Sequence, residues 1–252
     1  MGCSGRYGNG DTQWMTAGAG VQHSEMFPLV HQDKPNTLDL FQIWLNLPSK
    51  DKLCPPAFAM FWDEATPYVT LNDAASGKSA KVQVVAGALE GATPLAPPPN
   101  SWAAEDANDV AIWVVTIPDG CTVTLPPARL GAAANRAIYL VQGKSAVVGG
   151  DRIGNRTGAK IDASQPLTIT AEGGSTVELL LLQGKPIGEP VVQHGPFVMN
   201  TKEEIYQAFE DYQRTQYGGW PWKSGRDFVQ PRETPRQAFY NGKTEYPPTA
   251  IS

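Results

Sequence analysis

Short apolar runs separated by turn residues recur along most of the chain. The runs that are typical of β-strands lie at residues 38–46, 81–86, 110–117, 121–125, 136–142, 145–148, 167–171 and 176–182. Glycine and aspartate stand between them, as at Asp119-Gly120 and Gly173-Gly174. Short strands at this spacing, with such turn residues between them, predict an all-β sandwich or barrel.

Two segments depart from the β pattern. Residues 92–108 contain Pro94 and three consecutive prolines at 97–99. Because proline has no N–H to donate to a sheet, this stretch predicts a connector between two domains. A capping box of Thr201 and Glu204 predicts the start of a helix, since each side chain can bond the backbone N–H of the other residue.

The predicted helix has one apolar face, formed by Ile205, Ala208, Phe209 and Tyr212. The glycine pair Gly218-Gly219 is expected to stop it. The tail at residues 220–252 is rich in proline, arginine and tyrosine and has no periodicity. Two interpretations of the tail stay open, an arm packed on a domain and a disordered segment.

Composition and charge narrow the class of protein. The net charge of −5 predicts a surface that repels phosphate backbones, so direct nucleic-acid binding is not expected. No run approaches the roughly 18 apolar residues that a membrane span needs. The three cysteines are far apart and odd in number, which indicates free thiols in a reducing, intracellular compartment.

Candidate chemistry rests on three histidines, His23, His31 and His194. His23 and Glu25 stand two residues apart, so on an extended strand both side chains point to one face. An imidazole and a carboxylate together suit iron, manganese or another divalent transition metal. The alternative is a polar pair at a strand end. His31 is expected in a loop, and His194 at a turn as a structural residue.

The segment WMTAGAGVQHSEM at residues 14–26 resembles the signature of the pirin family. Residues 42–48 and 189–205 are similar to further motifs of that family, and the resemblance covers roughly residues 8–222. It implies an all-β bicupin, with two cupin β-barrels in tandem and a C-terminal helix. The expected domains are residues 1–91 for the N-terminal barrel, 92–108 for the connector, 109–200 for the C-terminal barrel and 201–252 for the helix and tail.

The resemblance also implies a metal site in the N-terminal barrel, where the family holds iron through three histidines and one glutamate. His23 and Glu25 match the third histidine and the glutamate, while the family's other two histidines lie on an earlier strand. The chain starts after that strand, so the barrel is expected to be incomplete and to bind Fe(II), or another divalent transition metal, weakly. In the second barrel the corresponding positions hold Asn135, Ala137 and Gln142, which are poor metal ligands.

Three functions follow from the resemblance. The first is a flavonol (quercetin) 2,3-dioxygenase-type oxidoreductase in its complete form, with a small aromatic substrate and with Glu25 as the base. The second is an iron-dependent, redox-sensing transcriptional co-regulator that binds a transcription-factor protein. The third is a metal-free truncated form without activity. The resemblance implies a cytoplasmic or nuclear location, and nothing in the sequence separates the enzyme from the co-regulator.

Overall fold

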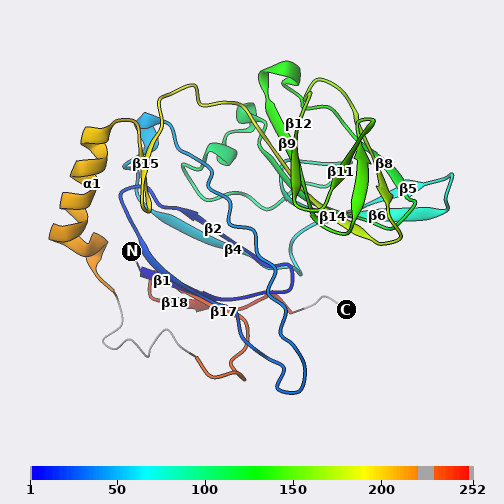
Figure 1. The fold of residues 1–252 in the computed structure, drawn as a ribbon. Helices are drawn as coiled ribbons and strands as arrows, with labels where there is room; N and C mark the ends of the chain where they lie inside the picture. Colours follow the sequence, from blue (N-terminus) through cyan, green and yellow to red (C-terminus); the bar gives the residue numbers. More distant parts are fainter. Residues whose placement is uncertain (1, 221–229, 250–252) are drawn as a thin grey trace. The chain divides into compact units, whose positions relative to one another are not determined.

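The computed structural model describes residues 2–220 and 230–249, and the chain folds into two compact units (Figure 1). The first unit comprises Met1–Ala65, Pro97–Ala104 and Ile187–Ser252. The second comprises Thr66–Ala96 and Glu105–Pro186. Each unit has its own sheets and its own hydrophobic core.

The second unit contains two antiparallel sheets. The larger has the order β12-β9-β14-β7-β6-β5. Its strands are β5 (Tyr68–Asp73), β6 (Lys78–Ala86), β7 (Ala111–Ile117), β9 (Asn135–Gln142), β12 (Thr157–Ile161) and β14 (Val177–Gly184). The smaller has the order β11-β10-β13-β8. Its strands are β8 (Thr122–Leu125), β10 (Ser145–Val148), β11 (Asp151–Gly154) and β13 (Leu167–Glu172).

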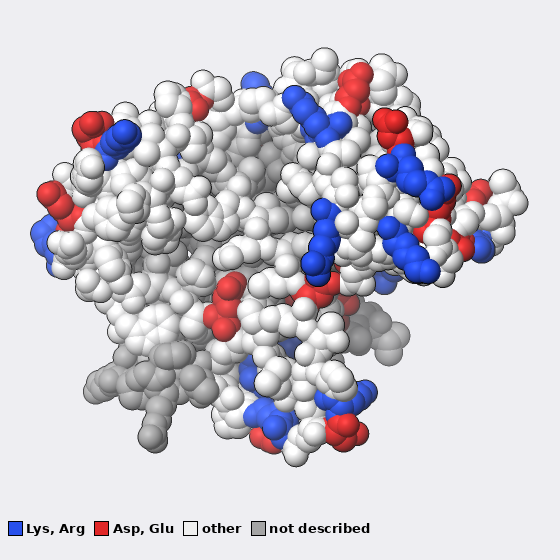
Figure 2. Space-filling view, viewed as in Figure 1, with Lys and Arg blue, Asp and Glu red and all other residues white. Residues whose placement is uncertain are grey.

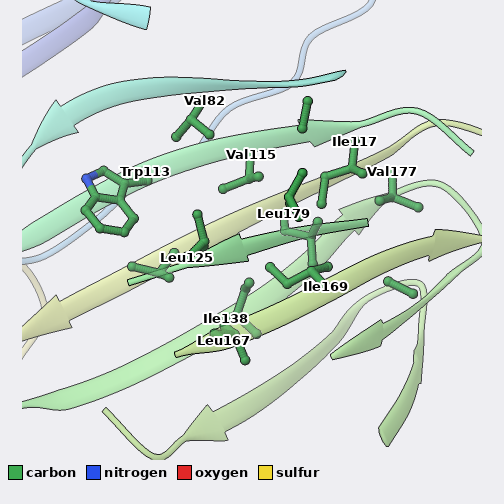
Figure 3. Packing of buried hydrophobic residues seen from close by; sticks show 14 of the residues in the cluster. Val82, Trp113, Val115, Ile117, Leu125, Ile138, Leu167, Ile169, Val177 and Leu179 are labelled. Carbon is green, nitrogen blue, oxygen red and sulfur yellow. The ribbon is translucent and has the colours of Figure 1, made fainter. Parts of the chain in front are cut away.

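The core of this unit lies between the two sheets (Figure 3). Alternate residues of β7, namely Trp113, Val115 and Ile117, are almost completely buried, as the period of two in a strand requires. Leu125 and Ile169 meet them from the smaller sheet. Burial of each such side chain contributes about 1.5–3 kcal/mol, so this unit is held together mainly by apolar packing.

The first unit is built around a four-stranded sheet of order β18-β17-β1-β3. Its strands are β1 (Gly2–Arg6), β3 (Gln22–Met26), β17 (Gln237–Tyr240) and β18 (Lys243–Glu245). β1 is parallel to β3 and antiparallel to β17, so part of the C-terminal tail is a packed arm. The unit also has two strand pairs, β2 (Thr12–Thr16) with β4 (Ala57–Phe61) and β15 (Val192–His194) with β16 (Phe197–Met199). Residues 221–229 lie outside the described residues.

The predicted helix is confirmed as α1 (Lys202–Thr215). The backbone N–H of Glu204 donates to Thr201 Oγ1 at 3.2 Å, and the N–H of Thr201 donates to Glu204 Oε2 at 2.9 Å. The helix ends earlier than the glycine pair, because Gln216 already has left-handed backbone angles. Within the described parts of the chain, no helix is long and apolar enough to cross a membrane.

The other helices are single turns of 3-10 helix: η1 (Ser49–Asp51), η2 (Trp102–Ala104), η3 (Asp106–Asn108), η4 (Gly131–Ala133) and η5 (Gln216–Gly218). Two of them, η2 and η3, lie in the proline-rich stretch predicted as a connector.

Two further expectations differ from the structure. The predicted strand at residues 38–46 is wrong, because this fully described segment forms no strand, and Leu38 and Trp44 are exposed. Its aromatic and branched residues supply strand propensity, but strand formation also requires pairing with a neighbouring strand. Residues 66–91, assigned to the N-terminal barrel, pack with the second unit because β6 pairs with β7. The compact units therefore do not coincide with the segments 1–91 and 109–200.

Candidate functional site

His23 and Glu25 both lie on β3 of the first unit. They are two residues apart on one strand, so their side chains leave the same face of the sheet. The neighbouring strand β1 places Cys3 opposite His23 and Gly5 opposite Glu25. His23 is exposed and Glu25 is half-buried. The structure thus places the two predicted site residues together on one strand face.

The carboxylate of Glu25 is held from one side. Tyr7 Oη donates to Glu25 Oε1 at 2.6 Å, and Gln13 Nε2 donates to the same oxygen at 2.8 Å. No hydrogen bond from a described residue reaches Glu25 Oε2. Burial first, and then the hydrogen bond to Glu25, raise the pKa of Tyr7, so the phenol stays protonated and remains a donor. Its ring packs edge-on against Phe27, with centroids 5.2 Å apart.

Gly5 provides the space for this arrangement. A Cβ atom at residue 5 would lie 2.6 Å from Gln13 Oε1 and 3.0 Å from Tyr7 Cδ1. Gln13 Oε1 itself is buried and lacks a hydrogen-bond partner in the described part of the chain. No spacing motif in the sequence connects Gly5, Tyr7 and Gln13 with Glu25, because the pairing of distant strands brings them close.

Cys3 lies next to these residues as a buried thiol. Its Sγ is 3.9 Å from both Met15 Sδ and the carbonyl oxygen of Gln22. Burial is the main cause that raises the pKa of Cys3 to about 12. The thiolate is the form that attacks or binds a metal, so burial disfavours the reactive form of Cys3. Cys3, Cys54 and Cys121 are free thiols in the structure.

The described residues do not make a complete metal site. Among residues 2–220 and 230–249, no group of three or more His, Cys, Asp or Glu side chains could hold a metal ion. His31 lies in a loop, where its N–H donates to Asn36 Oδ1 at 2.8 Å. His194 is exposed on β15 and packs edge-on against Phe209. His23 and Glu25 therefore fit a transition metal in donor type but not in number.

The second unit offers no replacement. On β9 the inward residues are Arg136, Ile138 and Leu140, while Asn135 is exposed and Ala137 only half-buried. Arg136 is 1% exposed, and its guanidinium donates to Gln183 Oε1 and to the carbonyl of Pro126. The positions that the resemblance matched to metal ligands thus face away from the core, and the inward position holds a cation.

An open hollow of about 590 Å³ lies in the second unit, lined by residues that include Thr70, Asp73, Glu90 and Thr122. The carboxylate of Asp73 accepts hydrogen bonds from Ser76 Oγ and from the backbone N–H groups of Thr122 and Ala75. These bonds, with that from Ser76 first, lower the pKa of Asp73 to about 2. The carboxylate organises the adjoining turn and is not a free acid or base.

Charged side chains of both signs lie beside one another on the face shown in Figure 2. This face has no continuous basic patch of the kind that follows a nucleic-acid backbone. The side chains of β3 and its neighbours therefore remain the best candidate site.

The Pirin family matches residues 1–45, and the pirin C-terminal cupin domain matches residues 112–218. A Pseudomonas aeruginosa protein, provisionally named a quercetin 2,3-dioxygenase, is 33% identical over 216 residues, which cover 86% of this chain and 70% of the relative. A pirin-like protein of Caulobacter vibrioides is 35% identical over 216 residues, with 86% and 71% covered.

Among solved structures, that of a quercetin 2,3-dioxygenase from Acinetobacter baumannii is similar to this chain with a TM-score of 0.63. The similarity covers 86% of this chain and 75% of the other, at 21% sequence identity. At that identity the similarity concerns the fold, and it agrees with the mainly β, cupin-type architecture described above.

Proposed function

This chain belongs to the pirin family, and we propose that it is a flavonol-binding bicupin of the quercetin 2,3-dioxygenase type. In this proposal Glu25 accepts the proton of a ligand hydroxyl group, and His23 and Glu25 are two of the ligands of a divalent transition metal such as Fe(II). The name of the Pseudomonas aeruginosa relative supports a small aromatic, flavonol-like substrate.

The main support for the proposal is that both hydrogen bonds to the Glu25 carboxylate go to one of its two oxygens. Tyr7 and Gln13 both donate to Oε1, which fixes the plane of the carboxylate and leaves Oε2 for a ligand. A carboxylate oxygen within hydrogen-bond reach of an acidic hydroxyl group can take its proton, and a positioned base of this kind contributes about 10²–10⁴-fold to a rate. Two neutral donors hold the carboxylate without neutralising its charge.

His23 and Glu25 form a half-site, which supplies two of the ligands that the proposed metal ion needs. Two donors on one strand leave most positions around a metal to water, and binding through them alone is weak. We expect a protein extended at its N-terminus by a strand with the pattern His-x-His to bind Fe(II) stoichiometrically. The extension supplies two imidazoles to the His23 and Glu25 pair.

The test is the iron content of the 252-residue chain and of the extended protein after anaerobic reconstitution. The chain should retain well under one equivalent, and the extended protein about one. His23→Ala should abolish retention in the extended protein, whereas the matched change His194→Ala, at an exposed histidine of the same unit, should leave it unchanged. Tight, stoichiometric iron in the 252-residue chain would overturn the half-site.

Oxygen uptake with quercetin tests the substrate and the base. Glu25→Gln in the extended protein preserves the size of the side chain but removes the proton acceptor. We expect the rate to fall by about 10²-fold or more. An unchanged rate would exclude Glu25 as the base, and no uptake from iron-loaded protein would exclude the dioxygenase assignment.

A further inference from the structure

The loop at residues 17–21 leads directly into β3, and a backbone contact fixes its first half. The N–H of Ala19 donates to the carbonyl oxygen of Cys54 at 2.9 Å. Gly18 has a φ of +50°, and a Cβ atom there would lie 2.1 Å from the same carbonyl oxygen. Residue 18 must therefore be glycine for this approach of two backbone segments.

The end of α1 holds the second half of the loop. Gly20 has a φ of +118°, and a Cβ atom there would lie 2.3–2.6 Å from ring atoms of Tyr217. The ring therefore lies directly against the backbone of Gly20. Gln22 Nε2 donates to the carbonyl oxygen of Gln216 at 2.6 Å. Gln22 is the residue immediately before His23, so the contact ends next to the candidate site.

Gln216 and Tyr217 adopt an uncommon backbone conformation to make these contacts. Their φ angles are 49° and 50°, two consecutive left-handed residues that are not glycine. For a bulky residue such as tyrosine this conformation is a genuine outlier that persists only when the surroundings enforce it. Strain of this kind concentrates at functional sites.

The surroundings of Tyr217 do enforce it. Its Oη donates to the carbonyl oxygen of Ala208 at 3.1 Å, and its N–H donates to Thr215 Oγ1 at 3.1 Å. Its ring meets those of Tyr212 and Phe197, with centroids 5.3 Å and 6.1 Å away. The position of the ring is thus fixed independently of the loop that it contacts.

We propose that Gln216 and Tyr217 form a clamp that positions the start of β3, and with it His23 and Glu25. The ring of Tyr217 limits the path of the backbone at Gly20, and the carbonyl of Gln216 fixes Gln22. Both act on the site through the loop, so they are positioning residues. The consequence for ligand binding rests on the proposed function, whereas the consequence for the loop does not.

Hydrogen exchange of the metal-free full chain tests the clamp directly. Tyr217→Ala should speed exchange of the amides from Gly20 to Glu25 by about 10-fold or more, because this segment then opens locally. Exchange in β4 should not change, and the ring proton signals of His23 should shift in NMR spectra. Tyr206→Ala is the matched control, since Tyr206 lies on α1, the helix just before the clamp residues in the chain, and is 68% exposed.

Two further variants separate the contacts of the clamp. Gln216→Gly relieves the left-handed strain and keeps the carbonyl, so exchange near His23 should stay slow. Tyr217→Phe keeps the ring and should behave like the unmodified chain at residues 20–25. Faster exchange that spreads equally over β4 in Tyr217→Ala, or no change at residues 20–25, would overturn the clamp.

Metal affinity in the extended protein separates the clamp from the proposed function. Loss of an outer contact that orients a ligand weakens metal binding by about 10–100-fold, and we expect a change of this order for Tyr217→Ala. Faster exchange at residues 20–25 with unchanged Fe(II) affinity would leave the clamp in place and count against His23 as a metal ligand.

Discussion

Replacing Asp11 by alanine should release the C-terminal arm from the first unit. The side chain of Asp11 is completely buried, and its Oδ1 accepts from Arg236 Nη1 at 2.7 Å and from the N–H of Asp63 at 2.9 Å. Its Oδ2 accepts from the N–H of Gly8 at 3.1 Å. Asp11 thus joins the arm that carries β17 to the turn between β1 and β2 and to the segment after β4.

The expected loss follows from these contacts. Removing one partner of a buried ion pair costs about 3–5 kcal/mol, because a charge is left without compensation. Arg236 is 26% exposed and also bonds Glu64, so the lower end of that range applies. The N–H groups of Gly8 and Asp63 also lose their acceptor. A destabilisation of about 3 kcal/mol is expected for the first unit.

Pulsed hydrogen exchange at increasing urea concentrations can monitor unfolding of the peptides of the first unit separately from those of the second unit. With a slope of about 2 kcal/mol per molar urea, the midpoint should fall by about 1–2 M. Asp211→Ala is the matched control, because Asp211 bonds Arg214 at 2.6 Å on the exposed face of α1. A surface pair contributes less than about 1 kcal/mol. Equal midpoints for the two variants would refute the assigned role of Asp11.

Two further predictions concern the same unit. Gly18→Ala should destabilise the first unit far more than Gly195→Ala. Both residues have positive φ (+50° and +57°), but only at residue 18 would a Cβ atom lie against a carbonyl oxygen. Equal losses in the urea midpoints of the two variants would contradict that contact. The hydrogen bond to Glu245, and then burial, raise the pKa of Tyr240 from 10.0 to about 12. The folded state therefore favours the protonated phenol, so its stabilising contribution is complete below pH 10 and is lost as the pH rises towards about 12. Between pH 10 and about 12 the Tyr240→Phe variant should therefore lose less stability than the unmodified chain. Identical pH dependence of the free energy of unfolding in urea for the two proteins would contradict the hydrogen bond between Tyr240 and Glu245.

Local signals in the sequence predict the elements that depend on local interactions. The capping box at Thr201 and Glu204 places the start of α1 correctly, because both partners lie within one helical turn. The run at residues 145–148 coincides with β10, and 110–117 differs from β7 by one residue. In these strands the apolar residues either alternate with polar ones or form a continuous run. Such a pattern can be read from the sequence without knowing which strands lie next to one another.

Elements that depend on distant partners are not predicted in this way. The run at residues 38–46 has the composition of a strand but forms none in the described structure. In contrast, residues 237–240 in the aperiodic tail become β17 because β1 offers them a free edge. Strand formation requires a neighbour, and the sequence does not state which segments become neighbours.

The candidate site divides in the same manner. His23 and Glu25 are two residues apart, so the period of a strand by itself puts their side chains on one face. The donors to Glu25 lie 12 and 18 residues away in the chain, on or beside two other strands. Tyr217, in η5 just after the C-terminal end of α1, contacts Gly20. The sequence alone therefore determined the pirin family, the start of the helix and the shared strand face of His23 and Glu25, the two residues proposed for the site. Tertiary structure decided which groups hold that pair, because those contacts depend on strand pairing and packing between distant segments.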